Sequence, residues 1–178
     1  MEKIAAKYAA ALFEIALEQK IEQRLLSETK QLEEQLSAQP AFLKLLSQSQ
    51  INSNEKKAML VEVFPSFHPY LLNLLQLLVD KRRGLLMVDV MKEYRHLHNR
   101  HFHIIEAVAY TVIALTKDEI EEIEKTLSLK EGASVTLTNR LDASLISGIK
   151  IRFEDKVIDA SMKTRIKDLR EHLIEGRS

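Results

Sequence analysis

Apolar residues dominate the stretch 70–84 on nearly every side of the helix that their spacing predicts. With an advance of about 100° per residue, only one narrow stripe of this helix is polar. The stripe consists of Asn73, Gln76 and Asp80. A surface helix normally shows a single apolar stripe, so a helix that is apolar almost all round is buried on several sides. Pro69 suits the first helical position and Gly84 suits the stop, which predicts a central helix among amphipathic neighbours.

A second strongly apolar helix is predicted over residues 4–19. Its charged residues share one stripe about 60° wide on a helical wheel. The stripe consists of Lys3, Lys7, Glu14 and Glu18. The rest of the surface is more apolar than a single core contact needs. Either its alanines let neighbouring helices wrap it closely, or part of the apolar face stays open for a partner.

Helical spacing of apolar residues continues through the first hundred residues. Four further helices are predicted over 21–37, from Pro40, from Asn52 or Ser53, and over 85–98. The connectors between them are short. Residues 1–103 are therefore predicted to form an N-terminal six-helix bundle.

The pattern changes to alternation near residue 104. Three strands are predicted, over 106–114, 135–141 and 149–154. In the first of them, Val108, Tyr110 and Val112 share one face. Residues 104–178 are predicted to form a small α/β domain, so the whole chain has a two-domain α+β fold.

Two helices are predicted within this second domain. Thr116 can cap the first, and Glu119 completes a capping box with it. Gly132 ends the turn that follows this helix. Ser161 caps the second, whose apolar residues recur at helical spacing. They are Ile166, Leu169 and Leu173.

Composition and charge narrow the class of protein. Hydrophobic residues make up 46% of the 178 residues, and the low counts of Gly (4) and Pro (3) favour long regular elements. The sequence has no cysteine, which excludes disulfides and thiolate metal sites. Its 26 basic and 26 acidic residues cancel, which argues against nucleic acid as a partner. With no apolar run of transmembrane length and no secretory start, we expect a soluble protein of a reducing compartment.

Two basic clusters are the remaining candidates for chemistry. Residues 95–103 contain four of the six histidines, but His96 and His98 point about 200° apart on a helix and cannot share one metal ion. We predict a solvated basic helix end there, and no metal site. Lys81, Arg82 and Arg83 could bind an anion, but cations also favour the end of a helix.

No motif in the chain indicates catalysis or a cofactor. There is no Gly-rich phosphate loop, no nucleophile elbow and no two-histidine metal motif. Asp142 and Asp159 flank turns, where carboxylates usually accept from backbone amides. The sequence is more typical of a binding or structural protein than of an enzyme.

The stretch Val135–Leu173 resembles the signature region of the δ subunits of F-type ATP synthases, the oligomycin sensitivity-conferring protein family. The resemblance is carried by Asp142, Leu145, Ser147, Gly148, Ile149, Ile151, the run Val157–Asp159 and Ser161. Near the start, the run Lys7–Phe13 resembles the family's opening. One departure is Ala160, where the family usually has Gly. Length and domain order also match, so the resemblance covers essentially the whole chain.

The resemblance implies a non-catalytic subunit that joins the catalytic head of the synthase to its peripheral stalk. In such families, N-terminal segments of the α subunits bind a groove between the first and fifth helices. The C-terminal domain meets the C-terminal ends of the b subunits. The implied location is the cytoplasmic face of a bacterial cell membrane, as part of the complex. The alternative is a helical protein-binding adaptor unrelated to ATP synthase.

Site residues follow from the edges of the two over-apolar helices. We predict an α-subunit groove lined by Tyr8, Ala11, Ile15, Asn73, Leu74 and Leu77. The contact with b subunits is predicted at Leu169 and Leu173, although these leucines could instead only cover the sheet. Structural roles are predicted for Gly148, Asp159 and Ser161.

Overall fold

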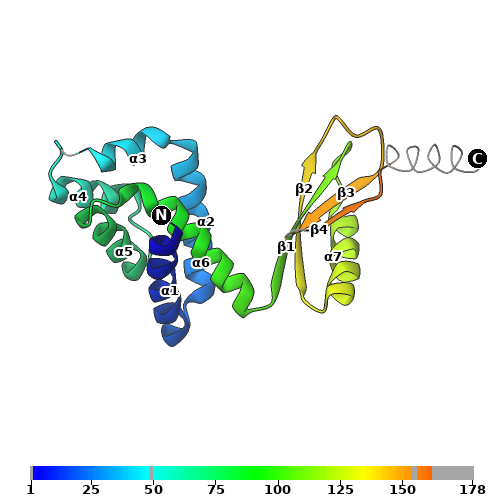
Figure 1. Ribbon diagram of the computed structural model, residues 1–178, viewed down its shortest axis with the longest axis horizontal. Coiled ribbons are helices and arrows are strands. Elements are labelled where there is room, and N and C mark those ends of the chain that lie inside the picture. Colours follow the sequence, from blue (N-terminus) through cyan, green and yellow to red (C-terminus); the bar gives the residue numbers. More distant parts are fainter. Residues whose placement is uncertain (1, 49, 154–155, 162–178) are drawn as a thin grey trace, which may run out of the picture. The chain divides into compact units, whose positions relative to one another are not determined.

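The computed structural model describes residues 2–48, 50–153 and 156–161 (Figure 1). The chain divides into two compact units, Met1–His101 and Phe102–Ser178, a boundary two residues before the one expected from sequence. The first unit is helical, and the second contains a four-stranded sheet. The mixed helical and sheet architecture predicted from the sequence is confirmed.

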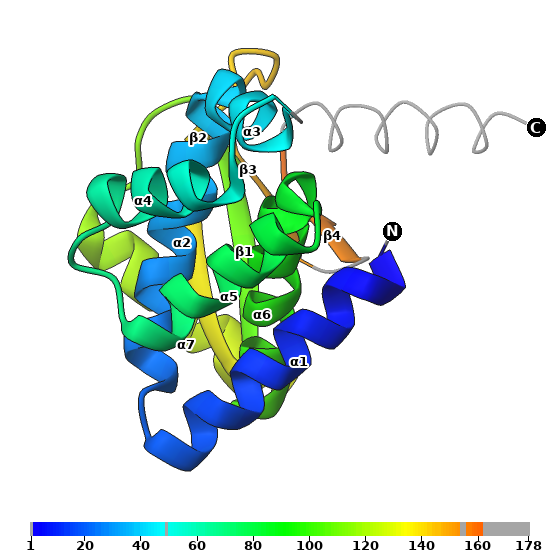
Figure 2. The ribbon, with the colours of Figure 1, turned by 90° about the vertical axis from the view of Figure 1, so that its left-hand side faces the viewer.

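Six α-helices follow one another in the first unit. They are α1 (Glu2–Gln19), α2 (Glu22–Ala38), α3 (Pro40–Ser47), α4 (Ser53–Val63), α5 (Pro69–Asp80) and α6 (Met87–His101), with a 3₁₀ turn, η1 (Gly84–Leu86), before α6. Helix α6 packs against α1 and α2, and α5 packs against α4. In Figure 2, α1 runs across α6. One hydrophobic core takes residues from all six helices.

Helix α5 is buried on several sides, as its sequence predicts. Leu71, Leu75 and Leu78 have no exposed surface, and Val79 is 5% exposed. Burying one leucine contributes about 1.5–3 kcal/mol relative to leaving it in water. The apolar excess of this helix is therefore largely explained by the core.

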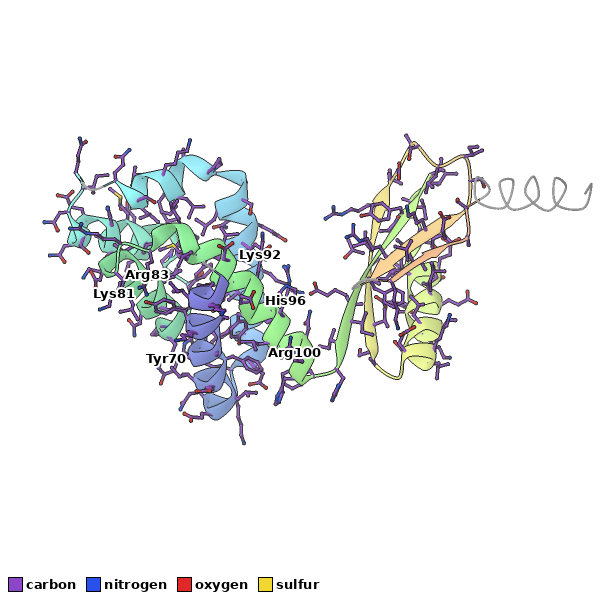
Figure 3. All side chains as sticks on the ribbon, viewed as in Figure 1. Tyr70, Lys81, Arg83, Lys92, His96 and Arg100 are labelled. Carbon is purple, nitrogen blue, oxygen red and sulfur yellow. The ribbon has the colours of Figure 1, made fainter. Side chains whose placement is uncertain are left out.

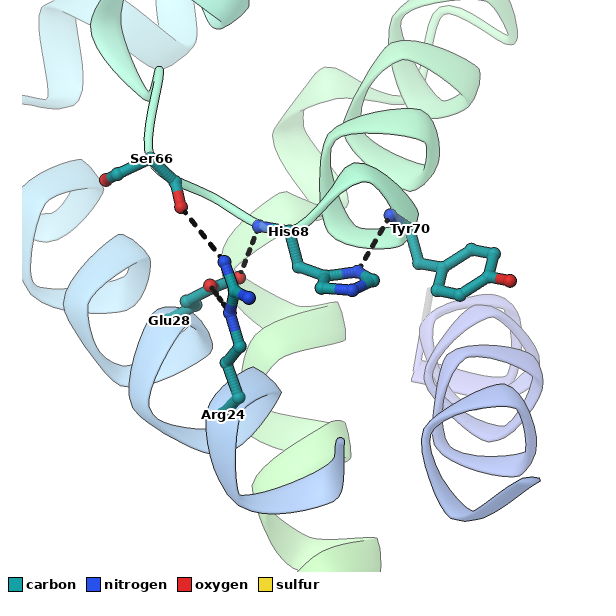
Figure 4. A network of polar contacts seen from close by, with 5 residues as sticks. All are labelled: Arg24, Glu28, Ser66, His68 and Tyr70. Atoms are coloured by element: carbon teal, nitrogen blue, oxygen red, sulfur yellow. Dashed lines mark hydrogen bonds and ion pairs between the residues drawn. The ribbon is translucent and has the colours of Figure 1, made fainter. Parts of the chain in front are cut away.

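The start of α5 is fixed by polar contacts from α2 (Figure 4). Pro69 is the first helical residue, and the Nδ1 atom of His68 accepts from the Tyr70 N–H at 3.3 Å. Glu28 accepts from the His68 N–H at 2.8 Å through one oxygen and from Arg24 at 2.9 Å through the other. The predicted opening at Pro69 is confirmed, and the anchor on α2 adds to it.

The end of α5 differs from the prediction. The helix stops at Asp80, and Arg82 takes the left-handed conformation with φ +55°. The backbone N–H groups of Arg82 and Arg83 return to the carbonyls of Val79 and Leu78 at 2.9 and 2.7 Å. Gly84 does not stop the helix. It lies buried against Leu46, where an added Cβ would be 3.5 Å from the leucine Cβ.

The second unit is built on four strands in the order β2-β1-β3-β4. The strands are β1 (Ile104–Thr111), β2 (Ser134–Leu141), β3 (Ile149–Phe153) and β4 (Lys156–Asp159). Strands β1 and β2 are parallel and are connected by α7 (Lys117–Glu131), whereas the other pairs are antiparallel. Strand β4 was not expected, because this short edge strand is mostly exposed and shows no alternation of burial.

The buried face of β1 is the one that carries its smaller side chains. Ala107, Ala109 and Thr111 are buried, while Val108 and Tyr110 are only half-buried. The buried alanines join the core with Leu127 of α7 and with residues of β2 and β3. The predicted strand is confirmed, and its small side chains, not Val108 and Tyr110, lie on the core side of the sheet.

Local signals around α7 are confirmed. The Thr116 hydroxyl accepts from the Glu119 N–H at 3.3 Å, and the Glu119 carboxylate accepts from the Thr116 N–H at 2.8 Å, which closes the capping box. The Glu119 carboxylate also accepts from the Thr116 hydroxyl at 2.8 Å, and the hydrogen bonds from the Thr116 N–H and hydroxyl hold the pKa of Glu119 below its usual range. Gly132 ends the helix in the left-handed conformation with φ +68°.

Gly148 lies where the backbone just before β3 comes close to the backbone just after β4. Its φ is +93°, and a Cβ added there would be 2.6 Å from the carbonyl oxygen of Ala160. The Ala160 N–H donates to the Ile149 carbonyl at 2.9 Å, and Asp159 accepts from the Ser161 N–H at 3.0 Å. Ser161 is 1% exposed. This geometry has no room for a side chain at position 148.

We expect Gly148→Ala to lower the free energy of unfolding of the second unit by about 2–4 kcal/mol, because a left-handed backbone and a steric clash add. Gly132→Ala is the matched control. It has a similar φ but no atom within 4 Å of the added Cβ, so we expect about 1–2 kcal/mol. Hydrogen exchange of the β1 and β3 amides in the full chain measures both. Equal losses would show that the contact with Ala160 is unimportant.

Candidate functional site

One flank of α1 leaves apolar side chains at the surface. Ile4 is 37% exposed, Ala11 is exposed, and Tyr8 and Ile15 are half-buried. These four positions fall within about 60° on the helical wheel, beside the buried face of Ala5, Ala9, Leu12, Phe13 and Ala16. The core therefore does not use all of the apolar surface of α1.

Helix α5 has a matching flank. Tyr70 is 37% exposed and Leu77 is 41% exposed, with exposed Asn73 beside them. Leu74 is 8% exposed and belongs mainly to the core. Of the predicted groove residues on α5, Asn73 and Leu77 are accessible and Leu74 forms the floor of this flank. Ile4 and Tyr70 are accessible apolar residues that the sequence prediction missed.

Tyr8 and the end of α5 are joined by a contact that the sequence did not reveal. The Arg83 guanidinium donates to the Tyr8 hydroxyl at 2.8 Å and lies over the tyrosine ring, 5.8 Å from its centre. Figure 3 shows Tyr70 and Lys81 at the two ends of α5, with Arg83 just beyond. Arg83 therefore orients Tyr8, a predicted groove residue. Within the basic run 81–83, Arg83 thus has a structural role.

The charged side chains of Asp80, Lys56 and Lys57, near the basic run 81–83, also form contacts within the first unit. Asp80 accepts from Ser53 at 2.6 Å and pairs with Lys57 at 3.1 Å, and these contacts lower its pKa. Lys56 is buried and donates to the carbonyl of Gln48 at the end of α3. These pairings give no support to an anion site at the end of α5.

The histidine tract is divided between surface and core. His96 is exposed on α6 (Figure 3). His98 has no exposed surface and packs with Phe13, at 6.4 Å between ring centres. The prediction of a solvated helix end is wrong for His98. Among the residues that the structure describes, no group of three or more His, Cys, Asp or Glu side chains is placed to hold a metal ion.

In the second unit, an open groove of about 780 Å³ lies at one end of the sheet. We call it the sheet-end groove. It is lined by residues 111–115, Glu119, Glu122, Ile123, residues 146–149 and Ala160. Ile113 is 80% exposed and Ile146 is 67% exposed, so its rim is strongly apolar. Gly148 is part of the lining. Asp159 and Ser161 are the sequence neighbours of Ala160, which also lines the groove.

Asn139 holds one wall of this groove in place. Its side-chain amide donates to the carbonyl of Ala109 at 3.1 Å and to the Thr111 hydroxyl at 2.8 Å. Its carbonyl oxygen accepts from the Leu115 N–H at 2.9 Å. The loop that exposes Ile113 is therefore braced on both sides. The predicted contact residues Leu169 and Leu173 lie outside the described residues.

Three comparisons relate the chain to known proteins. A family model described as ATP synthase delta (OSCP) subunit matches residues 4–173. ATP synthase subunit delta of Alkaliphilus oremlandii is 30% identical over 173 residues, which cover 97% of this chain and 96% of that protein. The protein of the same name from Lactobacillus acidophilus is 29% identical, covering 98% of this chain and 96% of that protein.

A solved structure shares the fold. It is a chain in the cryo-EM structure of the Toxoplasma gondii mitochondrial ATP synthase hexamer, with a TM-score of 0.71 and 18% identity. The match covers 96% of this chain and 97% of that one. None of the helices that the structure describes combines the length and the apolar character needed to cross a bilayer.

Burial of His98 predicts that the first unit loses stability in acid. Burial lowers the pKa of His98 from 6.5, and nearby Lys30 and His101 act in the same direction, against Asn99 and Glu22. The unfolded chain therefore takes up the proton first. We expect the free energy of unfolding to fall as the pH drops below about 6.5 and through the lower pKa of the folded state.

The measurement is urea denaturation between pH 7.5 and 5.5, a range above the titration of ordinary carboxylates. His98→Gln should flatten the pH dependence, whatever its effect on stability at pH 7.5. His96→Gln, at an exposed position of the same helix, should leave the slope as it is. An unchanged slope in the His98 variant would contradict the prediction.

Proposed function

The chain belongs to the ATP synthase delta (OSCP) subunit family, and we propose from this how its two units divide the work of a peripheral-stalk subunit. It is a non-catalytic subunit that links the catalytic head of the F-type synthase to the b-subunit stalk. The alternative of an adaptor unrelated to ATP synthase is thereby excluded. The finer assignments below are proposals.

The helical bundle formed by α1–α6 is the part that holds the head. The observation that carries this proposal is the pair of accessible apolar flanks on α1 and α5. They would receive the amphipathic N-terminal segments of α subunits, with Tyr8, Ala11 and Ile15 on one side and Asn73, Leu74 and Leu77 on the other. A helix laid into a groove binds through apolar anchors spaced at i, i+3, i+4 and i+7.

The second unit is the part that meets the stalk. We assign the C-terminal ends of the b subunits to it, with Leu169 and Leu173 as contact residues. The complex then holds the chain at the cytoplasmic face of the bacterial membrane. Rotation of the central shaft drags on the head, so this protein needs affinity and stiffness rather than chemistry.

Ala11→Trp tests the bundle assignment. Because Ala11 is exposed on the apolar flank, an indole there should leave the bundle folded but fill the groove. We expect a synthetic peptide with the N-terminal sequence of an α subunit to bind at least about tenfold more weakly by titration calorimetry, a loss of about 1.4 kcal/mol. Glu34→Trp, exposed on α2, is the control and should bind normally. Normal binding by the Ala11 variant would remove this flank from the interface.

The double variant Leu169→Asp, Leu173→Asp tests the stalk assignment. We expect it to lose binding of a fragment that holds the C-terminal end of a b subunit, and to keep binding of the α-subunit peptide. His172→Asp, between the two leucines in sequence, is the control. Faster hydrogen exchange throughout β1 and β3 would instead mean that the leucines belong to the domain core. Retained b-fragment binding would place the stalk contact elsewhere.

A further inference from the structure

We propose that the sheet-end groove is the docking site of the chain's own segment 162–168, which would complete the core of the second unit. The groove combines three properties of an unfinished core. It is largely apolar, it has a braced wall, and two isoleucines stand exposed at its rim. An exposed surface held this firmly is typical of a surface that is covered in the working molecule.

The course of the chain favours its own next segment as the occupant. Ala160 lines the groove, and Ser161, the last described residue, is 1% exposed. The segment that begins at residue 162 therefore starts beside the groove. In a helix, Ile166 would lie only about 8 Å along the axis from Ser161, well within the groove's surroundings.

The sequence of the segment fits the groove in apolar pattern. Met162 and Ile166 are four residues apart, so they would share one face of a helix. A volume of about 780 Å³ accommodates two such side chains and leaves room for the helix backbone at the opening. Leu169 and Leu173 continue the same stripe beyond the groove and stay available for the stalk contact proposed above.

Charge also matches. The segment contains three basic side chains, Lys163, Arg165 and Lys167, and one acidic side chain, Asp168. The groove wall formed by α7 presents Glu119 and Glu122. A basic segment is attracted to this acidic wall, and the attraction is stronger at low ionic strength. A docked partner of acidic character would be repelled there.

Disulfide trapping tests the proposal without any partner protein. Because the chain has no cysteine, the pair Ile113→Cys, Ile166→Cys is its only thiol pair. Position 113 is 80% exposed, so the substitution leaves the fold intact. We expect an intramolecular disulfide under mild oxidation of the full chain, because docking brings the two Cα atoms within the few ångströms that a disulfide requires.

The pair Ser134→Cys, Ile166→Cys is the matched control. Ser134 pairs with Ile104 at the far end of β1, about 23 Å from Thr111 along the strand. The Ile113 pair should oxidise at least about tenfold faster than this control. Equal rates would overturn the proposal. Disulfide-linked dimers as the main product would overturn it too, and would assign the groove to a second copy of the chain.

Hydrogen exchange of a second pair of variants tests the docking without introducing cysteines. Ile166→Asp should raise hydrogen exchange several-fold at the amides of residues 111–115, since it places a charge in the apolar groove. Thr164→Asp, about 200° away on a helix, should not. Exchange that is the same in both variants would contradict the proposal. Neither test involves α or b subunits, so failure here leaves the stalk function untouched.

Discussion

The arrangement of the helical unit depends on the hydrogen bonds that the buried carboxylate of Glu28 accepts. Glu28 is 8% exposed, and its two oxygens accept from Arg24 of α2 and from the backbone N–H of His68. His68 in turn caps α5. A buried carboxylate without such partners costs several kcal/mol, so α2 and the start of α5 hold each other in one arrangement. The strongly apolar helix α5 is thereby positioned by Glu28, one of the few buried charged residues in the part of the chain that the structure describes.

The apolar flanks of α1 and α5 could be predicted from the sequence, because they follow from helical angles. Apolar residues of α1 and α5 exceeded what one core face needs, and in both helices the excess lies on a flank beside the core. The angular position of each residue predicts which side chains form the flank of a helix, because the repeat of 3.6 residues per turn is fixed. Helical angles do not give the depth of each residue. Leu74 is buried while Ile4 and Tyr70 are accessible, because packing against neighbouring helices decides exposure at the edge of a face.

Features that depend on residues far apart in sequence could not be predicted. The Arg83–Tyr8 hydrogen bond joins positions 75 residues apart, and the burial of His98 depends on Phe13 of α1. In the second unit, alternation predicted that β1 is a strand but not which face is buried. The capping box at Thr116 and the stop at Gly132 were predictable because each involves only a few consecutive residues.

The two units differ in the size of their hydrophobic cores. The bundle buries residues from six helices, whereas the described core of the second unit comes from one helix and the sheet. A small domain buries a smaller fraction of its surface, so each additional apolar contact matters more to it. Any segment or partner that binds only its folded form adds to its stability. If the second unit meets the stalk, as proposed, assembly would therefore stabilise the unit that has the smaller core of its own.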